Sequence, residues 1–256
     1  MVENLIKARL ARGEMQIGAF LNGASVVATE IAGRAGYDWC LVDAEHGPND
    51  VPLIRDQLLA LASVGCPAAV RVPVGEVRVL KQALDIGAQT VLVPMVDTPE
   101  HAAEMARACR YPPEGNRGLA AGAVRASGYG ADPDYMFSAN DQICLIVQCE
   151  SRASVDNIDA IAAVDGVDAV FIGPSDLAAD MGNLGNPTAP EVMQAIDHVL
   201  ERLAAAGTPS AIFCLDPALL GHFRDKGATF IAVASDIGAL TKGLRGGAAA
   251  AREALG

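Results

Sequence analysis

The feature that most constrains this chain is a regular alternation between short apolar runs and Ala-rich segments of helical period. Each run is a few residues long and nearly continuous in apolar character, which is typical of parallel strands that are covered on both faces. The runs that predict strands are Gln16–Leu21, Trp39–Asp43, Ala68–Val72, Thr90–Met95, Ile143–Gln148, Ala169–Ile172, Ser210–Cys214 and Phe230–Ala234.

Segments of helical period lie between these runs, and many are followed by glycine, the usual residue at a helix C-terminus. The predicted helices are Ala24–Ala35, Asp50–Val64, Glu76–Ile86, Pro99–Arg110, Ser154–Val164, Pro190–Ala206 and Pro217–Lys226. Eight strand–helix units in 256 residues fit a (β/α)₈ TIM barrel, whose usual length is about 250 residues. We therefore predict the α/β class and a single (β/α)₈ domain over residues 1–256. A doubly wound open sheet is the alternative, but no GxGxxG motif follows the first run.

The stretch Tyr111–Gln142 interrupts this alternation, with prolines at its start and a Gly-rich centre. Long loops in compact domains tend to be functional or to lie at a subunit contact. We expect one of these two roles for it.

Charge and cysteine content exclude several classes of protein. The formal net charge is −12 with no basic cluster, which argues against binding to nucleic acid or to an anionic membrane. No apolar run is long enough to span a bilayer, and the opening MVENLIKARLARGE predicts an amphipathic helix rather than a signal peptide. The six cysteines are scattered without a CxxC pair, which indicates reduced, buried thiols. We predict a cytoplasmic protein.

Polar residues gather where the predicted strands end. In a (β/α)₈ barrel the chemistry takes place at the carboxyl ends of the strands, so we expect these side chains to converge on one face. They are Asp43, Glu45, His46, Arg71, Gln148, Glu150, Ser175 and Asp176.

Glu150 and Asp176 follow neighbouring strands and predict a metal site. Carboxylates are hard oxygen ligands that suit a divalent ion and leave positions open for substrate and water. The alternative is that each carboxylate caps the helix that follows its strand. The expected proximity of His46 and Arg71 favours the metal site.

His46 and Arg71 are the candidates for proton transfer and charge stabilisation. His46 lies beside two carboxylates directly after a strand, and Asp43 could orient its ring as a general base. Arg71 interrupts an apolar strand, which is costly without an anionic partner. It could hold a structural carboxylate such as Asp43 or Asp85, or it could face a developing oxyanion.

The tripeptide Gly173, Pro174 and Ser175 leads into a predicted helix start at Asp176. Main-chain N–H groups at such a start would accept a substrate carboxylate. Cys149 stands next to Glu150, but the alternation of strand side chains points its thiol away from the site.

Together these segments resemble the class II pyruvate aldolases of the 4-hydroxy-2-oxoheptanedioate aldolase type. The resemblance spans the whole chain in order and is specific. The segments that carry it are LVDAEHGPND, VRVP, TVLVPMVDTPEHA, RYPPEGNRG, LIVQCES and VFIGPSDLAADMGNLGNP. It implies a metal-dependent (β/α)₈ barrel that assembles as a homohexamer, a trimer of dimers, with a helix exchanged between neighbouring subunits.

The resemblance also implies roles for individual residues. Glu150 and Asp176 match the family's ligands for Mg²⁺ or Mn²⁺, with Co²⁺, Ni²⁺ or Zn²⁺ as other divalent ions. His46 matches the histidine of the base system, with Asp43 and Asp85 as its carboxylate neighbours. The arginine that stabilises the enolate oxygen corresponds to Arg71. The positions that bind pyruvate and line the pocket correspond to Gln148, Gly173, Pro174, Ser175, Phe20 and Leu215. Arg117, in RYPPEGNRG, matches a motif with a structural role or a place at the subunit contact.

The implied reaction forms or cleaves a 4-hydroxy-2-oxo acid from the enolate of pyruvate or hydroxypyruvate and an aldehyde. The base is either His46 or a metal-bound water relayed through it. Departures from the family, such as Ser175 for alanine and Phe20 for tryptophan, bear on the choice of aldehyde. A citramalyl- or malyl-CoA lyase-like enzyme is the alternative, and a catalytically inert barrel is a third interpretation. All four lysines fall on helix-like segments, which counts against a Schiff-base aldolase.

Overall fold

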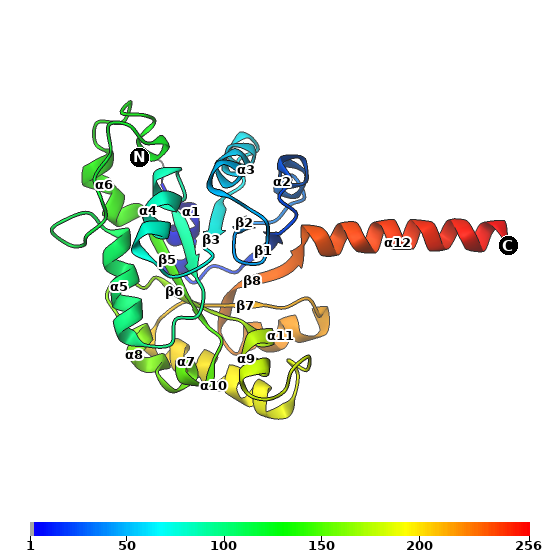
Figure 1. Ribbon diagram of the computed structural model, residues 1–256. Coiled ribbons are helices and arrows are strands. Elements are labelled where there is room, and N and C mark those ends of the chain that lie inside the picture. The colour runs from blue at the N-terminus through cyan, green and yellow to red at the C-terminus, as the bar shows by residue number, and fades with distance from the viewer. Residues whose placement is uncertain (1–2) are drawn as a thin grey trace.

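The computed structural model describes residues 3–256 and contains a closed barrel of eight parallel strands in chain order (Figure 1). The strands are β1 Gln16–Leu21, β2 Trp39–Asp43, β3 Ala68–Arg71, β4 Thr90–Val93, β5 Cys144–Cys149, β6 Ala169–Ile172, β7 Ser210–Phe213 and β8 Ala228–Ser235. Pairing of β1 with β8 closes the ring. The predicted (β/α)₈ fold is confirmed, and every predicted strand is present with its bounds moved by two residues at most.

Helices surround the barrel (Figure 1). They are α1 Leu5–Ala11, α2 Val26–Gly33, α3 Val51–Ser63, α4 Val77–Asp85, α5 Pro99–Cys109, α6 Tyr135–Gln142, α7 Arg152–Asp156, α8 Ile158–Ala162, α9 Pro174–Asp180, α10 Pro190–Ala206, α11 Pro217–Asp225 and α12 Asp236–Leu255, with a 3₁₀ turn η1 at Arg125–Ser127. Local chemistry explains several starts. Ser25, Asp50 and Thr98 accept main-chain N–H groups in the first turns of α2, α3 and α5.

Strand side chains alternate between two apolar clusters, one inside the barrel and one between the strands and the helices. In β5, Cys144 and Ile146 belong to the inner cluster, whereas Leu145, Val147 and Cys149 belong to the outer one. Ile6 and Leu10 of α1 join the inner cluster and cover the amino-terminal end of the barrel. The helix predicted at the start of the sequence therefore closes this end of the barrel. Residues 1 and 2 lie outside the part of the chain that the structure describes.

A close approach inside the barrel requires glycine at position 18. A Cβ atom there would lie 2.1 Å from atoms of the Trp39 ring, so any larger residue would displace the indole. Trp39 stacks in turn on Phe230, with ring centroids 4.0 Å apart. This aromatic layer fills the barrel below its mouth and is fully buried.

Three segments differ from the prediction. The helix expected at Ser154–Val164 is two short helices, α7 and α8, separated at Asn157, whose backbone leaves the helical conformation. The stretch Tyr111–Gln142, predicted as irregular, contains η1 and α6. The sequence pattern also did not predict α12, because its glycines and alanines carry little periodic signal.

α12 extends away from the barrel (Figure 1). None of its residues is buried, and Ile237, Leu240, Leu244 and Leu255 are exposed. No helix within residues 3–256 has both the length and the apolar character needed to cross a membrane.

Arg117 anchors the long segment between α5 and β5. Its side chain is fully buried, and Nη2 donates to Oδ1 of Asp85 at 3.1 Å and to the Tyr135 hydroxyl at 3.2 Å. The guanidinium carbon lies 4.5 Å from the centroid of the Tyr111 ring. Because a buried cation is costly when it is unpaired, these contacts fix the path of the segment across the outside of the barrel.

We expect Arg117→Ala to destabilise the protein by about 3 kcal/mol, because it removes the packing between two tyrosines and leaves Asp85 without its partner. Urea unfolding followed by circular dichroism measures the effect. Arg107→Ala, at an exposed position on α5, is the matched control and should stay within about 0.5 kcal/mol of the parent. Equal stability of the two variants would contradict the anchoring role.

Candidate active site

Four of the polar residues predicted to converge lie on inward-facing positions that continue the inner row of a strand. Trp39 and Leu41 face the barrel interior, so Asp43 does as well. By the same alternation Arg71 faces inward two residues after Ala69, and Gln148 and Glu150 continue the inward-facing row of Ile146. The apolar interior thus gives way to charged groups at the carboxyl end of the barrel.

Asp43 and Arg71 form a buried, bidentate ion pair. Arg71 donates from Nε to Oδ1 of Asp43 at 2.8 Å and from Nη2 to Oδ2 at 2.7 Å. Asp43 is fully buried and also accepts from the side-chain amide of Asn22. Its remaining contacts are with the main-chain N–H groups of Glu45 and His46. The pair therefore locks the guanidinium in one orientation and shapes the loop after β2.

Glu45 extends this network toward the mouth. Its Oε2 lies 2.9 Å from Nη1 of Arg71 and 3.8 Å from Nε2 of His46. Burial raises the pKa of the Glu45 carboxyl, and Arg71 opposes that rise. Arg71 thus bridges two carboxylates, one fully buried and one at the edge of the site.

The structure corrects the expected role of Asp43 toward His46. Asp43 contacts the main chain of His46 and not its imidazole, and the His46 side chain is 62% exposed. The ring instead has Glu45 as its nearest charged neighbour. Asp43 therefore positions the histidine through the backbone.

Asp85 is not brought to His46 within one chain. It lies at the end of α4 and forms an ion pair with Arg117. The expectation that Asp85 would be a carboxylate neighbour of His46 is therefore not met within the chain. The alternative that Arg71 holds Asp85 is wrong, because Arg71 holds Asp43 and Glu45.

Glu150 is buried at 2% exposure, and its carboxylate has two contacts. Oε1 accepts from the main-chain N–H of Met95 at 2.8 Å, and Oε2 accepts from the side-chain amide of Gln148. Burial raises the pKa of Glu150 to about 7, and the negative charges of Asp176 and Glu45 add to the rise. The group is therefore a carboxylate for which a bound cation would be favourable.

Asp176 lies in the first turn of α9 and is exposed at the mouth. The chain reaches it through Gly173, where a Cβ atom would lie 2.6 Å from Oε2 of Glu150. Glycine is therefore needed for the main chain to pass so close to the buried carboxylate. The predicted pair comes to one site, with Asp176 on the solvent side.

The donor set fits a divalent cation. Glu150 and Asp176 are oxygen donors, and Oε1 of Gln148 is buried without a hydrogen-bond partner. No group of three or more His, Cys, Asp or Glu residues suited to a metal occurs between residues 3 and 256. Any cation here would take two carboxylates from the chain and leave its other positions to substrate and water.

Residues 173–175 offer fewer main-chain N–H groups to a ligand than the sequence predicted. The Gly173 N–H donates to the Cys149 carbonyl at 3.1 Å, and Pro174 has no N–H. Of the three residues only Ser175 can therefore offer an amide to a ligand.

Apolar residues frame the site from below and from one side. Phe20 is buried beneath Arg71, with the guanidinium carbon 5.1 Å from the centroid of its ring. Leu215 follows β7 and is 57% exposed at the rim. Cys149 belongs to the outer cluster, as predicted, and each of the four lysines lies in or directly after a helix.

Sequence reasoning missed two contributors, Asn22 and Met95. Asn22 directly follows β1, and its main-chain N–H donates to Asp236 at 2.9 Å. The signal that the sequence offered for Asn22 was a polar residue at the end of a strand. Met95 adopts a φ of +51°, which turns its N–H toward Glu150. Nothing in the sequence pattern indicates a positive φ at a methionine.

Comparison with known proteins gives the chain its relatives. The family model described as HpcH/HpaI aldolase/citrate lyase matches residues 16–242. A hydroxypyruvate/pyruvate aldolase from Roseovarius nubinhibens is 48% identical over 91% of this chain and 91% of its own length. A 5-keto-4-deoxy-D-glucarate aldolase from Enterobacter sp. (strain 638) is 47% identical over 92% and 91%. The crystal structure of an HpcH/HpaI aldolase/citrate lyase family protein from Burkholderia cenocepacia superposes with a TM-score of 0.93 at 40% identity, over 97% of this chain and 99% of the other.

The free energy of unfolding of the metal-free protein should fall as pH rises, because of Glu150. Its folded pKa of about 7 lies above the ordinary value of 4.5, so folding favours the protonated carboxyl. The wild type should therefore lose about 3 kcal/mol between about pH 4.5 and pH 8, relative to Glu150→Gln, which cannot ionise.

Denaturant unfolding of both proteins across that range measures this difference. Asp180→Asn removes an exposed charge from the same helix as Asp176 and keeps an oxygen that can accept the main-chain N–H of Arg152, so it controls for a general loss of negative charge and should follow the wild type. Parallel stability curves for the wild type and Glu150→Gln would contradict the perturbed carboxyl.

Proposed function

The chain belongs to the HpcH/HpaI aldolase/citrate lyase family and is an aldolase, a lyase that makes or breaks a carbon–carbon bond, and we propose that it joins the enolate of pyruvate or hydroxypyruvate to an aldehyde with the help of a divalent metal ion. The observation that carries the proposal is the gathering of Arg71, Glu150 and Asp176 at the barrel mouth, where the charges of Arg71 and Asp176 both act on the Glu150 carboxylate. The products are 4-hydroxy-2-oxo acids, and cleavage is the reverse reaction.

Glu150 and Asp176 would hold the cation, with Mg²⁺ or Mn²⁺ as the ions best suited to an oxygen site and Co²⁺, Ni²⁺ or Zn²⁺ as alternatives. When bound, the ion supplies Lewis-acid stabilisation of negative charge on the substrate's oxygen atoms. Binding would also relieve the repulsion among Glu150, Asp176 and Glu45 that contributes to the raised pKa of Glu150. Gln148 and the Ser175 amide would bind the 2-oxo acid next to these carboxylates.

Arg71 supplies a fixed positive charge for the enolate oxygen. Its Nε and Nη2 are occupied by Asp43, so the orientation of the guanidinium is set before substrate arrives. Such preorganised charge stabilises a developing oxyanion without a cost of reorganisation during the reaction. Glu45, on Nη1, restrains the third nitrogen at the edge of the site.

His46 accepts the proton from the C3 carbon of the donor, directly or through a water molecule. Its exposed ring stands at the mouth, where a substrate can reach it. Glu45, 3.8 Å from Nε2, stabilises the protonated imidazole that results. Phe20 and Leu215 provide apolar surface for the aldehyde, and the names of the relatives support pyruvate and hydroxypyruvate as donors.

Metal-stripped protein should lose its ability to release pyruvate from 4-hydroxy-2-oxo acids, and added Mn²⁺ or Mg²⁺ should restore it. Coupled oxidation of NADH by lactate dehydrogenase measures pyruvate release. Asp176→Asn should lower kcat/KM at saturating metal by about 100-fold or more, because one of two protein ligands is lost.

Asp180→Asn, one turn further along α9, is the matched control and should retain full activity. Full activity in excess chelator would overturn the metal dependence. If the well-folded protein released no pyruvate with any metal or donor but cleaved citramalyl-CoA or malyl-CoA, the acyl-CoA lyase alternative would replace this proposal.

For its assembly we propose a homohexamer in which α12 packs against a neighbouring copy of the chain. Ile237, Leu240, Leu244 and Leu255 lie on one face of α12 and are exposed to solvent. The helix also contains four glycines, each of which weakens an isolated helix. A projecting helix of this composition needs a partner surface, and its glycines allow close approach. A cytoplasmic location stays a prediction.

Leu240→Asp combined with Leu244→Asp should dissociate the hexamer, because it places two charges on that apolar face. Size-exclusion chromatography with light scattering gives the mass in solution. Ala239→Asp combined with Ala249→Asp adds the same charge to the opposite face of α12 and should leave the hexamer intact. A double-leucine variant that remains hexameric would contradict the role of this helix.

A further inference from the structure

The carboxylate of Asp236 binds the loop that follows β1. Asp236 is the first residue of α12, and its Oδ1 accepts the main-chain N–H of Asn22 at 2.9 Å, while its Oδ2 accepts that of Gly23 at 3.0 Å. Strand register explains this contact, because Ser235, the last residue of β8, pairs with Phe20 of β1. The start of α12 therefore lies beside the end of β1.

An acidic residue in the first turn of a helix often serves only the helix itself. In α12 the capping role belongs to Ser235, whose side chain accepts the N–H of Gly238 at 3.1 Å. One oxygen of Asp236 also accepts the N–H of Ile237, but both oxygens reach the loop after β1. A Cβ atom on Gly23 would lie 2.8 Å from Oδ2 of Asp236, so glycine at this position leaves room for the carboxylate.

Asn22 connects this loop to the candidate active site. Its side-chain amide donates to Oδ2 of Asp43, the oxygen that also accepts from Nη2 of Arg71 at 2.7 Å. Among residues 3–256, Asn22 and Arg71 are the only donors to this oxygen, whereas Oδ1 also accepts two main-chain N–H groups of the loop after β2. The orientation of the Asp43 carboxylate, and with it that of the guanidinium, therefore depends on where Asn22 is held.

We propose that Asp236 is a positioning residue for Arg71, acting through Asn22 and Asp43. The inference rests on the proposed function, in which the guanidinium of Arg71 faces the enolate oxygen. Without the Asp236 carboxylate, the loop after β1 loses two hydrogen bonds, and the Asn22 amide is no longer fixed against Asp43. The guanidinium then has more orientations open to it. A charge that must be reoriented during the reaction stabilises the transition state less.

Steady-state kinetics of pyruvate release, with Mn²⁺ at saturation, test the proposal. Asp236→Ala should lower kcat by about 10-fold and leave KM within about twofold, because Arg71 acts on charge that develops in the transition state. Asn22→Ala should have the same effect, since it removes the link from Asp236 to Asp43. The double variant should be no slower than Asn22→Ala alone, because two groups that act in series do not contribute additively.

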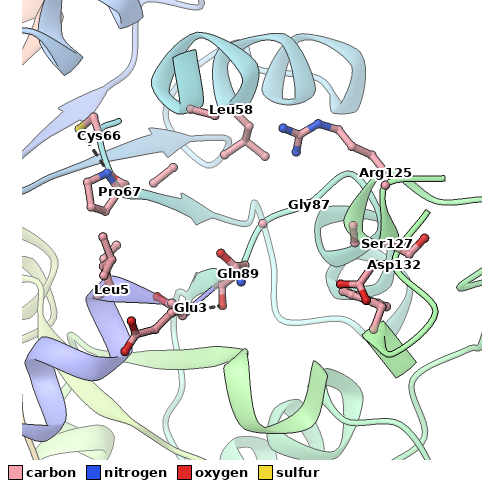
Figure 2. Close-up of a pocket in the computed structure, with 18 of the residues that line it drawn as sticks. Glu3, Leu5, Leu58, Cys66, Pro67, Gly87, Gln89, Arg125, Ser127 and Asp132 are labelled. Atoms are coloured by element: carbon pink, nitrogen blue, oxygen red, sulfur yellow. Dashed lines mark hydrogen bonds between the residues drawn. The ribbon is translucent and has the colours of Figure 1, made fainter. Parts of the chain in front are cut away.

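Asp38→Ala is the matched control. Asp38 accepts the main-chain N–H of Ile17 at 2.9 Å, so it is a carboxylate that holds β1 at the strand's amino-terminal end. At this end of the barrel, the turns before β3 and β4 line a cavity of about 780 Å³ (Figure 2), and no residue in the series of contacts from Asp236 to Arg71 lines it. The control variant should therefore keep the kcat of the wild type.

Hydrogen exchange of the metal-free protein gives a readout that does not depend on activity. In the wild type the N–H groups of Asn22 and Gly23 should be protected, although they lie outside the helices and strands. Asp236→Ala should speed their exchange by about 10-fold or more, whereas Asp38→Ala should speed exchange at Ile17 instead. Because the wild-type measurement needs no variant, the proposal stays testable even if Asp236→Ala does not fold.

Four results would overturn the proposal. They are a kcat within about twofold of the wild type for Asp236→Ala, losses that multiply in the double variant, an equal loss of kcat in Asp38→Ala, and unprotected N–H groups at Asn22 and Gly23 in the wild type. Light scattering should give Asp236→Ala the mass of the wild type, and a smaller mass together with multiplied losses would assign the effect to the assembly instead.

Failure of this inference differs from failure of the proposed function. A wild type that releases no pyruvate would count against the proposed function. An active wild type that gives any of the four results counts against the role of Asp236 alone.

Discussion

The alternation of side chains along parallel strands is the constraint on which the rest of this structure depends. Once eight strands close into a ring, every second residue must fill the interior, and the apolar run ends where the ring opens to water. A polar or charged residue two positions beyond the last inner apolar side chain therefore points into the mouth. Asp43, Arg71 and Gln148 all arise in this way, and Glu150 stands two positions further along the same inward-facing row, so the rule that packs the barrel also places the charged groups of its site.

Placing charge at the end of an apolar interior is costly, and the site meets that cost in two different ways. Asp43 and Arg71 compensate each other through two hydrogen bonds, so their charges persist and the guanidinium is held rigidly. Glu150 has only neutral donors, a main-chain N–H and an amide, and its neighbours Asp176 and Glu45 are acidic. The charges of Asp43 and Arg71 therefore balance each other within the chain, whereas the surroundings of Glu150 favour an added cation.

The strands, Glu150 and Arg71 could be predicted because each depends on a local pattern with period two, and Asp176 could be predicted because it comes soon after the end of a strand. Three features could not. The ring of His46 points away from Asp43 because the loop after β2 turns around main-chain hydrogen bonds, which leave no residue pattern. Asp85 lies with Arg117 because of a long segment that crosses the outside of the barrel. Met95 contributes a main-chain N–H through a positive φ, which depends on the folded loop and not on its side chain.

The two faces of one strand have different surroundings for the same geometric reason. On β2, Asp43 faces inward at the mouth, whereas Cys40, three residues earlier, packs in the apolar cluster between the strands and the helices. The main-chain N–H of Cys40 donates to the Pro67 carbonyl at 3.0 Å, which joins β2 to the residue directly before β3. The Asp43–Arg71 pair joins the same two strands at their other end. The strand pairing that builds the barrel wall therefore also holds Asp43 and Arg71, which are register partners, against each other at the site.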